Sequence, residues 1–455
     1  MENKRENFGG RIAVVAALAG SAIGLGSIWR FPYMVGEYGG AAFAVVYILA
    51  TFIISLPVFI SEAVIGRRAR ASSFSAMSKL RPGRPLWKAA GVLSVAIPLL
   101  INSYYCVIGG WSLEYLFKSL GGEFIFYSDA DTAVIFNKFI SSPFLPLLMH
   151  LLFMAACTFV VARGIQFGIE MFSKITIPAL FVLVLVVIIY SISLPGAEKG
   201  VEYLVKPDFS QITPRSIAYA MGQSFYSLSL GMGAVITYGS YIKKEESIPS
   251  AGIWTAISTL FFAVLAAFAV MPAVFAGGMQ PGAGPGLIFQ SIPYVFSKMG
   301  MEHPTLSAII SIVFFLAVVV AAMTSCISLI EVGVSFLKEK FSMGRIRACL
   351  VVFLLCGSLG VICSLSFGPL SSFVIRGKII FEMLDWLTSN ILLLVMSLLT
   401  VLFVGFAMKR EDVYDEFTNG GTKKNSVRIF KGFYFFIKWI SPVAVLTIFI
   451  TNFIL

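Results

Sequence analysis

Two glycine- and serine-rich runs interrupt long apolar stretches of this sequence, and they are the features best suited to binding chemistry. The first is Gly24-Leu25-Gly26, and the second extends from Ser227 to Gly233. Glycine pairs weaken a helix, and a helix that unwinds inside an apolar layer leaves amide and carbonyl groups in need of partners. Such groups can hold an anion, an ammonium or an alkali cation. Close helix packing is the alternative explanation for either run taken alone.

The composition places these runs in a membrane rather than in a soluble core. Of 455 residues, 58% are hydrophobic and 13% are charged, whereas soluble domains have about 25% charged residues. A membrane-spanning helix needs about 20 apolar residues. Eleven blocks qualify, at about 11–34, 40–66, 88–117, 142–161, 168–193, 214–241, 249–277, 304–340, 345–365, 378–407 and 430–455. The sequence therefore predicts an all-α polytopic membrane protein that spans a lipid bilayer.

The basic residues predict the orientation of these spans. Residues 66–88 contain seven basic residues and no acidic one, although the whole chain carries a net charge of only +11. Loops of this kind stay in the cytoplasm. We therefore expect a multi-pass protein of the plasma (inner) membrane with a cytoplasmic N-terminus and, after eleven spans, a C-terminus outside. Because the basic residues lie in loops and not on one face, we do not expect nucleic acid as a partner.

The two interrupted blocks are the first and the sixth, which predicts an internal repeat. Corresponding breaks in two halves of a membrane protein are typical of inverted repeats around a binding site. We therefore expect one transmembrane domain over residues 1–455. Its first repeat would be 1–193 with helices 1–5, its second 214–407 with helices 6–10, and 408–455 would hold a loop and one extra helix.

Four segments together resemble the neurotransmitter:sodium symporter family. They are Gly20 to Tyr33 (GSAIGLGSIWRFPY), Gly222 to Gly231 (GQSFYSLSLG), Thr324-Ser325, and Asp385 to Asn390 (DWLTSN). The resemblance covers essentially the whole chain and is closest to the bacterial amino-acid branch, which includes eleven-helix members. It implies the leucine-transporter fold, an inverted 5+5 helix repeat with discontinuous helices 1 and 6.

The resemblance implies a site for an amino acid at the two breaks. The amides of Leu25 and Gly26, at the positive end of a half-helix, suit a carboxylate, and the freed carbonyls of Ala22, Tyr226 and Ser227 suit an ammonium group. In the family a tyrosine at the position of Tyr105 donates to the carboxylate, although a buried tyrosine otherwise serves packing. Monoamine carriers have an aspartate where this chain has Gly24, which favours an amino acid here.

The implied pocket for the substrate side chain is mostly apolar. By resemblance its lining consists of Ile101, Tyr226, Ser229, Met232, Ser325 and Leu329. No member of this set could neutralise an acidic or basic side chain, so we expect a neutral, hydrophobic amino acid.

The resemblance implies two sodium sites, and this sequence matches the family's ligands more closely at the second site than at the first. The second site of the family would use the carbonyls of Gly20, Ile23 and Ala321 with the hydroxyls of Thr324 and Ser325. Hydroxyls of this kind can instead bond their own helix. The first site would use Ala22, Ser27, Ser227 and Thr259. Family members usually have asparagine at the position of Ser27, and asparagine or aspartate at that of Thr259. We therefore expect this first site to be weakened or absent.

Chloride dependence stays open on the sequence alone. The corresponding region has Tyr47, Gln223, Ser227, Thr259 and Ala263, with neutral donors and no carboxylate.

Charged residues near the ends of the spans resemble the gates of the family. Arg30 and Asp385 match the outer pair, and Arg5 and Glu339 match the inner pair with Tyr241 beside it. Glu62 resembles a family carboxylate that holds the unwound part of helix 6, and we expect it to be structural.

These observations favour sodium-coupled symport of neutral, hydrophobic amino acids by alternating access. Two alternatives stay open because the first sodium site is reduced: a carrier-like protein that senses amino acid without transporting it, and a proton-coupled amino-acid permease. An enzyme is not expected, because His150 and His303 are isolated and no nucleophile–base cluster appears. The identity of the amino acid, the sodium stoichiometry and the oligomeric state are not specified by the sequence.

Overall fold

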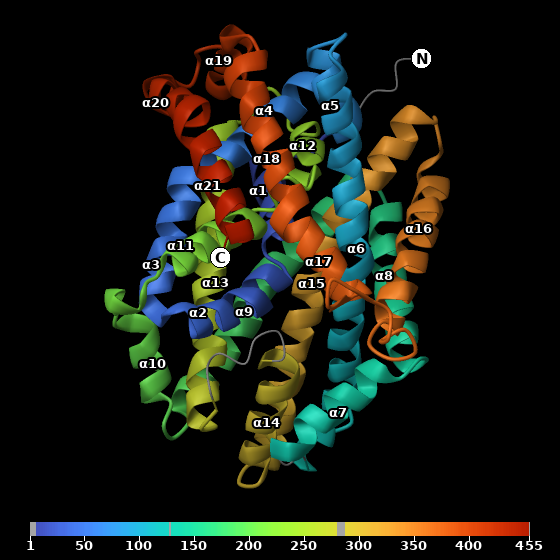
Figure 1. Cartoon of the computed structure of the whole chain (residues 1–455), viewed down its shortest axis with the longest axis vertical. Helices are drawn as coiled ribbons and strands as arrows, with labels where there is room; N and C mark the ends of the chain where they lie inside the picture. Colours follow the sequence, from blue (N-terminus) through green and yellow to red (C-terminus); the bar gives the residue numbers. More distant parts are fainter. Residues whose placement is uncertain (1–5, 127–128, 280–286, 455) are drawn as a thin grey trace.

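Long helices that run along one axis make up most of the structure, a computed structural model that describes residues 6–126, 129–279 and 287–454 (Figure 1). Nine helices within these ranges are long and apolar enough to cross a membrane, and a bent pair at the start of the chain adds a tenth. Helices α15 (Pro304–Lys340) and α16 (Arg345–Leu365) match the predicted blocks 304–340 and 345–365 to the residue.

The other long spans also fall on predicted blocks. Five are Gly40–Ala69, with α3 (Gly40–Ala50) and α4 (Leu56–Ala69), then α6 (Pro85–Leu120), α8 (Leu145–Ala162), Ile165–Ser193 with α9 (Met171–Ser193), and α13 (Ile248–Ala276). The last two are Ile380–Ala407, with α17 (Ile380–Leu387) and α18 (Leu393–Leu402), and Lys424–Thr451, with α20 (Lys424–Phe435) and α21 (Ser441–Ile454).

The first span is broken, as predicted. Helix α1 (Arg11–Ala22) ends at the glycine run, and the chain continues through a π-helical turn, Gly26–Arg30, into α2 (Phe31–Tyr38) at an angle of 53°. The break lies at residues 23–25, slightly before the predicted centre. It frees main-chain groups in the middle of a membrane-spanning segment.

The sixth span is broken more widely. Helix α11 (Pro214–Ser227) and the short α12 (Ala234–Gly239) are separated by six residues. Three of these have positive φ, Ser229 at 53°, Gly231 at 73° and Gly233 at 67°, and glycine adopts that conformation without a steric penalty. The Gly231 amide donates to Glu62 Oε1 at 2.8 Å, so the fully buried Glu62 holds the unwound segment. The prediction of discontinuous helices 1 and 6 is confirmed.

The broken helices lie against a set of unbroken ones. Helix α15 packs on α6, α8, α9 and α16, while α1 packs on α9, α13 and α15. Helix α12 lies so close to α4 that a Cβ at Gly66 would come within 2.0 Å of the Ile236 carbonyl oxygen. A scaffold of continuous helices therefore surrounds the two breaks.

Several short elements were not predicted from the sequence. They are the helices α5 (Ser73–Leu80), α7 (Asp129–Ser141), α10 (Glu198–Val205), α14 (Ile292–Gly300) and α19 (Arg410–Thr418), and the hairpin of β1 (Val374–Ile375) with β2 (Lys378–Ile379). Figure 1 shows α5, α19 and α20 at one end of the bundle and α7 and α14 at the other. The short helices thus cover the two ends where the spans are joined.

Candidate functional site

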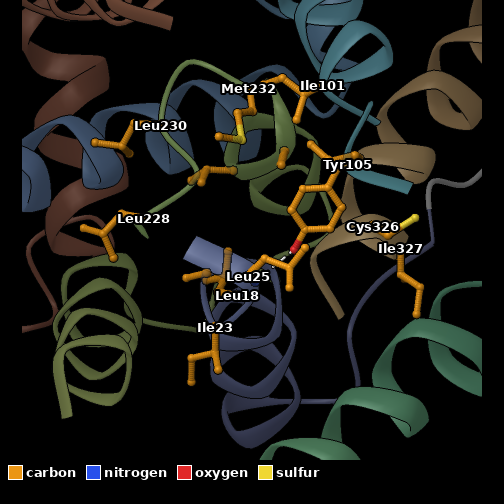
Figure 2. Close-up of a cluster of buried hydrophobic side chains, with 14 of the residues drawn as sticks. Leu18, Ile23, Leu25, Ile101, Tyr105, Leu228, Leu230, Met232, Cys326 and Ile327 are labelled. Carbon is orange, nitrogen blue, oxygen red and sulfur yellow. Dashed lines mark hydrogen bonds between the residues drawn. The ribbon is translucent and has the colours of Figure 1, made fainter. Parts of the chain in front are cut away.

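The break in helix 1 meets a tyrosine from α6. The Leu25 amide donates to the Tyr105 hydroxyl at 3.0 Å, and Figure 2 shows this hydroxyl pointing at the break, with Ile101 and Met232 beside the ring. Tyr105 is buried. Because its oxygen accepts from Leu25, the hydroxyl proton is available to a ligand that accepts hydrogen bonds. The two groups expected to hold a carboxylate therefore lie together.

A small cavity lies between the two breaks and the scaffold helices α6 and α15. Its lining includes all six residues predicted for the side-chain pocket, together with Ala22, Gly26 and Tyr105: Ser21, Ala22, Gly26, Ile101, Tyr105, Tyr226, Ser229, Met232, Ser325, Ser328 and Leu329. None of these lining residues is charged. Ser21 and Ser328 were not predicted.

Four serines of this lining tie the broken helices to α15. The carbonyl of Ser21 accepts from the Ser229 hydroxyl at 2.9 Å and from the Ser325 hydroxyl at 3.0 Å. The Ser21 hydroxyl in turn donates to Ser328 at 2.8 Å. Since α1 ends here, the Ser21 carbonyl is one of the groups without a helical partner, and these hydroxyls satisfy it. The spacing of Ser325 and Ser328, one helical turn apart, is the signal that could have identified Ser328.

Two glycines make the close approach possible. A Cβ at Gly24 would lie 2.0 Å from Ser325 Oγ and 2.8 Å from the Tyr105 hydroxyl. A Cβ at Gly26 would lie 2.9 Å from the Tyr226 ring. A larger residue at either position would therefore displace the groups that line the cavity.

Three of the five residues expected at the second sodium site, Thr324, Ile23 and Ala321, are in contact. Thr324 Oγ1 lies 2.9 Å from the Ile23 carbonyl oxygen and 2.8 Å from that of Ala321. Gly20 lies one turn before Ile23, and a Cβ there would be 3.0 Å from Ser173 Oγ of α9. Hydroxyl and carbonyl oxygens from α1 and α15 thus share one buried spot, a donor set that suits a hard alkali cation. Ser325, by contrast, directs its hydroxyl to Ser21.

The residues expected at the first sodium site differ from one another in their hydrogen-bond partners. Thr259 Oγ1 donates to the Thr255 carbonyl of its own helix at 2.8 Å. Ser227 Oγ accepts from Gln223 Nε2 at 3.1 Å. The buried Ser27 hydroxyl has no hydrogen-bond partner in the part of the chain that the structure describes. The three hydroxyls are therefore not joined to one common partner among the described residues.

The region considered for chloride is occupied by neutral groups. Gln223 Nε2 also donates to the Gly26 carbonyl at 2.8 Å, which fixes α11 to the second half of helix 1. The Tyr47 hydroxyl and Gln223 Oε1 are buried with no partner among the described residues. Ala263 is fully buried.

On one side of the cavity, Arg30 covers Tyr226. The guanidinium carbon lies 4.6 Å from the centre of the Tyr226 ring. Among the described residues, Arg30 and Asp385 do not form an ion pair. The Asp385 carboxylate instead accepts a hydrogen bond from the Ser389 hydroxyl at 3.2 Å. Arg30 and Ser389 border a common depression above Tyr226. Asp385 is thus linked through Ser389 to the depression that Arg30 borders.

Only one residue of the predicted inner gate pair lies within the described residues. Arg5 lies outside the described residues. Glu339 accepts from the amide and the hydroxyl of Ser72, at 2.6 and 3.1 Å. The Tyr241 hydroxyl donates to Glu331, which pairs with Arg345 at 2.5 Å. Tyr241 is thus placed beside a second carboxylate that the sequence analysis did not consider.

The segment that precedes α1 is held beside Tyr241. Glu6 pairs with Lys338 at 3.0 Å and accepts from the Ile165 amide at 3.1 Å. Phe8 is fully buried and packs edge-on against Tyr238 and Tyr241. Aromatic side chains and an ion pair therefore hold this segment against the bundle.

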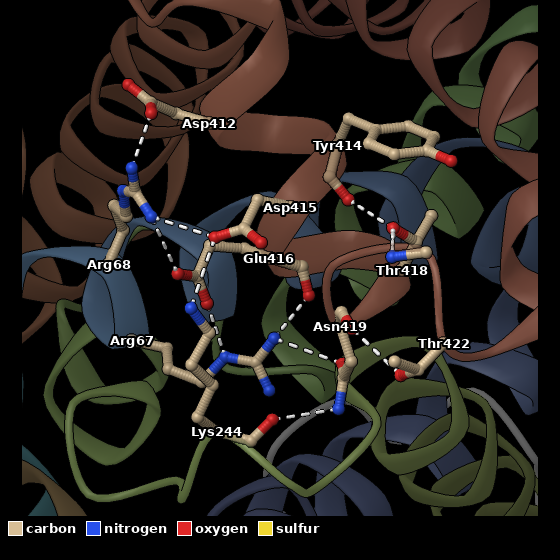
Figure 3. Close-up of polar contacts among 11 residues, drawn as sticks. Arg67, Arg68, Lys244, Asp412, Tyr414, Asp415, Glu416, Thr418, Asn419 and Thr422 are labelled. Carbon is tan, nitrogen blue, oxygen red and sulfur yellow. Dashed lines mark hydrogen bonds and ion pairs between the residues drawn. The ribbon is translucent and has the colours of Figure 1, made fainter.

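The loop helix α19 is docked on the same end of the bundle (Figure 3). The buried Arg67 pairs with Glu416 at 2.5 Å, and the less buried Arg68 pairs with Asp412 and Asp415 at 2.5 and 2.9 Å. Asn419, just after α19, donates to the Lys244 carbonyl at 2.8 Å. Two arginines that the sequence analysis used only for orientation therefore also join distant loops.

Two broken helices that meet at a buried, uncharged cavity inside a scaffold of continuous spans define a secondary transporter. The family comparison agrees: residues 5–135 and 140–455 match the sodium:neurotransmitter symporter family. The chain belongs to this family of sodium-dependent transporters, which are not enzymes.

Individual relatives support the same assignment. The chain is 35% identical to an uncharacterized sodium-dependent transporter, YhdH, of Bacillus subtilis over 99% of this chain and 98% of the relative. It is 25% identical to the sodium- and chloride-dependent taurine transporter of Canis lupus familiaris, over 90% of this chain and 73% of the relative. The crystal structure of MhsT in complex with L-phenylalanine superposes with a TM-score of 0.89 at 38% identity, over 98% of this chain and 100% of that chain. The leucine-transporter fold with two inverted five-helix repeats is thereby confirmed.

Proposed function

We propose that this protein is a symporter that uses a sodium gradient to move neutral, hydrophobic amino acids into the cell by alternating access. The observation that carries the proposal is the meeting of the Leu25 amide with the Tyr105 hydroxyl beside a cavity lined by uncharged residues. The amide end of a half-helix and a hydroxyl donor suit a carboxylate, and the unwound backbone supplies carbonyls for an ammonium group.

The expected preference for a hydrophobic side chain rests on the lining. Ile101, Met232 and Leu329 supply apolar surface, and none of the lining residues can neutralise a charged substrate side chain. An unpaired charge in such a site would be costly. MhsT, solved in complex with L-phenylalanine, shares 38% identity with this chain, which supports a substrate of the same kind.

Sodium coupling is proposed to act mainly through the second site. Gly20, Ile23 and Ala321 would supply carbonyl oxygens there, and Thr324 and Ser325 would supply hydroxyls. Ile23 belongs to the break that also presents the Leu25 amide. A cation that favours this arrangement of helix 1 therefore also favours the substrate site, which is the basis of coupling. Ala22, Ser27, Ser227 and Thr259 would hold a second ion only weakly.

The proposed orientation follows the loops. With the Arg-rich residues 66–88 in the cytoplasm, the covered end beside Phe8 faces inward and the opening beside Arg30 faces outward. The protein would then be a plasma-membrane protein with its C-terminus outside. Repeats 1–193 and 214–407 would rock around the cavity, and 408–455 would provide the extra helix.

Uptake into liposomes tests the proposal. Purified protein would be reconstituted, and accumulation of a panel of amino acids (phenylalanine, leucine, alanine, glutamate and lysine) would be measured with an inward sodium gradient. The matched controls replace sodium by choline at fixed pH and use protein-free liposomes. We expect concentrative, sodium-dependent uptake of phenylalanine or leucine.

Each other outcome would contradict a defined part of the proposal. Binding of phenylalanine without accumulation would indicate a sensor. Accumulation that persists in choline and follows a proton gradient would indicate a proton-coupled permease. Accumulation of glutamate or lysine alone would refute the expected substrate class.

A further inference from the structure

A groove at the same end of the bundle as α19 is not part of the substrate site. It lies between the start of α1, the first turns of α13 and the start of α20. Its lining consists of Arg11, Ser247, Pro249, Ser250, Ile253, Trp254, Ile257, Thr422, Lys423, Lys424, Asn425, Ser426 and Ile429. Three separate parts of the chain, far apart in sequence, therefore form one surface.

The polar end of this groove is strongly basic. Arg11, Lys423 and Lys424 line it, and no acidic residue does. The Arg11 guanidinium donates to the Ser250 hydroxyl at 3.0 Å, and none of the three cations pairs with a carboxylate among the described residues. Glu246 Oε1 lies 3.9 Å from the position that a Cβ on Gly10 would occupy, and Glu246 is not part of the lining. The groove thus attracts anions.

Hydroxyl groups and helix ends add to this attraction. The groove contains the hydroxyls of Ser247, Ser250 and Thr422, which can donate to an anion. Helices α1, α13 and α20 all begin here, and each contributes the positive end of its dipole. The three basic side chains remain the main source of the charge.

The other end of the groove is apolar and continues along a membrane span. Ile253, Trp254 and Ile257 follow Ser250 on one face of α13, at the spacing of successive helical turns. Trp254 is 49% exposed and Ile429 of α20 is 49% exposed. Because α13 is a 29-residue span, these side chains pass from the membrane surface toward its interior. Tryptophan at such a depth is typical of the interface between headgroups and acyl chains.

We propose that this groove binds an anionic phospholipid of the cytoplasmic leaflet, with its phosphate at Arg11, Lys423 and Lys424 and an acyl chain along Ile253, Trp254 and Ile257. Both parts of the lining are needed for this choice. An acidic soluble peptide would use the cations but not an apolar wall that enters the bilayer. A zwitterionic lipid would bring its own cation to a site that already has three. Basic pockets between spans are suited to anionic headgroups.

The bound lipid would join parts of the transporter that differ in role. Arg11 begins the helix that breaks at the cavity, whereas Lys423 and Lys424 begin the extra helix outside the two repeats. A lipid held by both would stabilise their contact. The proposal does not depend on which amino acid is transported.

Native mass spectrometry of the full chain tests the proposal. The protein would be titrated with phosphatidylglycerol or phosphatidylcholine in detergent, and thermal unfolding would be followed in parallel. The test variant is Lys423→Gln/Lys424→Gln. The matched control is Arg84→Gln/Lys88→Gln, which removes two exposed basic residues at the start of α6, at the same end of the bundle. Lys423→Arg/Lys424→Arg shows whether charge is sufficient.

We expect wild type to retain phosphatidylglycerol in preference to phosphatidylcholine and to gain thermal stability from it. The affinity for phosphatidylglycerol should fall about tenfold or more in the Gln variant and stay within about twofold of wild type in the control and the Arg variant. Inorganic phosphate alone should not stabilise the protein. Equal loss in the test and control variants, equal retention of phosphatidylcholine, full stabilisation by phosphate, or displacement of the lipid by an acidic peptide would each overturn the proposal. An Arg variant that loses binding while still folding would overturn it as well.

Discussion

The two expected sodium sites contain similar residue types but differ in where their oxygens point. At the second site, a single hydroxyl from Thr324 contacts carbonyls of Ile23 on the broken helix and Ala321 on the scaffold. At the first site, the Thr259 hydroxyl bonds its own helix and the Ser227 hydroxyl accepts from Gln223. Thr324 therefore brings a hydroxyl oxygen of α15 next to a freed carbonyl of helix 1, whereas the hydrogen bond of the Thr259 hydroxyl stays within its own helix.

The difference also follows from the break in helix 1. Ile23 lies at the end of α1, where its carbonyl has no partner four residues ahead in a regular helix. The Thr324 hydroxyl of the neighbouring helix α15 donates to that carbonyl. Ser27 lies beyond the break, in a π-helical turn, and its amide already donates to Gly24. At the second site, a hydroxyl from a different span therefore contacts a freed carbonyl of helix 1 directly.

Thr324→Val should have the largest effect on transport. The substitution keeps the shape of the side chain but removes the oxygen that joins α1 and α15. A contact to a charged group contributes about 1.5–3 kcal/mol, so the sodium concentration for half-maximal uptake should rise about tenfold to a hundredfold. Sodium titration of phenylalanine uptake in liposomes measures this.

The control for this variant is Thr176→Val. Its hydroxyl bonds the Phe172 carbonyl of its own helix α9 and is not part of either sodium site. Uptake by Thr176→Val should keep its sodium dependence within about twofold, as expected for a local hydrogen bond. A Thr324→Val protein that folds and shows unchanged sodium dependence would mean that the second site does not bind the coupling ion.

Ser27→Asn should strengthen the first site. An amide oxygen is a better sodium ligand than the Ser27 hydroxyl, and it would restore the residue usual in the family. We expect wild type to show a Hill coefficient near one for sodium, and the variant to approach two. The sodium concentration for half-maximal uptake should fall about threefold to tenfold, since one added ligand contributes about 1 kcal/mol.

A wild-type Hill coefficient near two would contradict the proposed weakness of the first site. Ser55→Asn is a suitable control because Ser55 is buried on the neighbouring span but bonds Ser224 instead of belonging to either site. It should not raise the Hill coefficient.

Thr259→Val should have a smaller effect than Thr324→Val. Its hydroxyl bonds Thr255 in the same helix, so valine removes one local hydrogen bond without opening a cavity. Sodium dependence should change less than about threefold, as expected when about 0.5 kcal/mol is lost. An effect as large as that of Thr324→Val, in the same uptake assay, would show that both sites contribute equally.

Much of the fold could be predicted because a bilayer requires about 20 apolar residues in every span. The apolar blocks gave the boundaries of α15 and α16 to the residue, and the glycine runs gave both breaks. Helix α19 could not be predicted in this way. It is held by ion pairs such as Arg67 with Glu416, which join residues far apart in sequence and leave no local pattern.

The candidate site was predicted in composition but not in its connections. The resemblance placed Tyr105 and the six pocket residues, and the structure brings them to one cavity. It did not reveal that Ser21 accepts from Ser229 and Ser325, because a hydroxyl in a membrane helix has many local alternatives. Tyr241 was expected near Glu339. In the structure, the Tyr241 hydroxyl donates to Glu331. Glu331 lies about two helical turns before Glu339, so the spacing in the sequence did not show which carboxylate Tyr241 would contact.

The smallest effect should come from pH, because neither site contains a group that titrates near neutrality. Both consist of carbonyl and hydroxyl oxygens. Outside the spans, Glu6 holds the segment before α1. Burial raises the pKa of Glu6, but its hydrogen bonds with Lys338 and the Ile165 amide outweigh burial and hold the pKa below its ordinary value.

A lowered pKa means that the Glu6 contacts stabilise the fold above the ordinary value for glutamate and are lost only as pH falls through the lowered one. Glu6 therefore stays ionised between about pH 6 and pH 8. The sodium concentration for half-maximal uptake should change less than about twofold over that range, measured at fixed membrane potential. A tenfold change would show that a proton competes with sodium or replaces it, and the contrast between the two sites would then no longer explain the coupling.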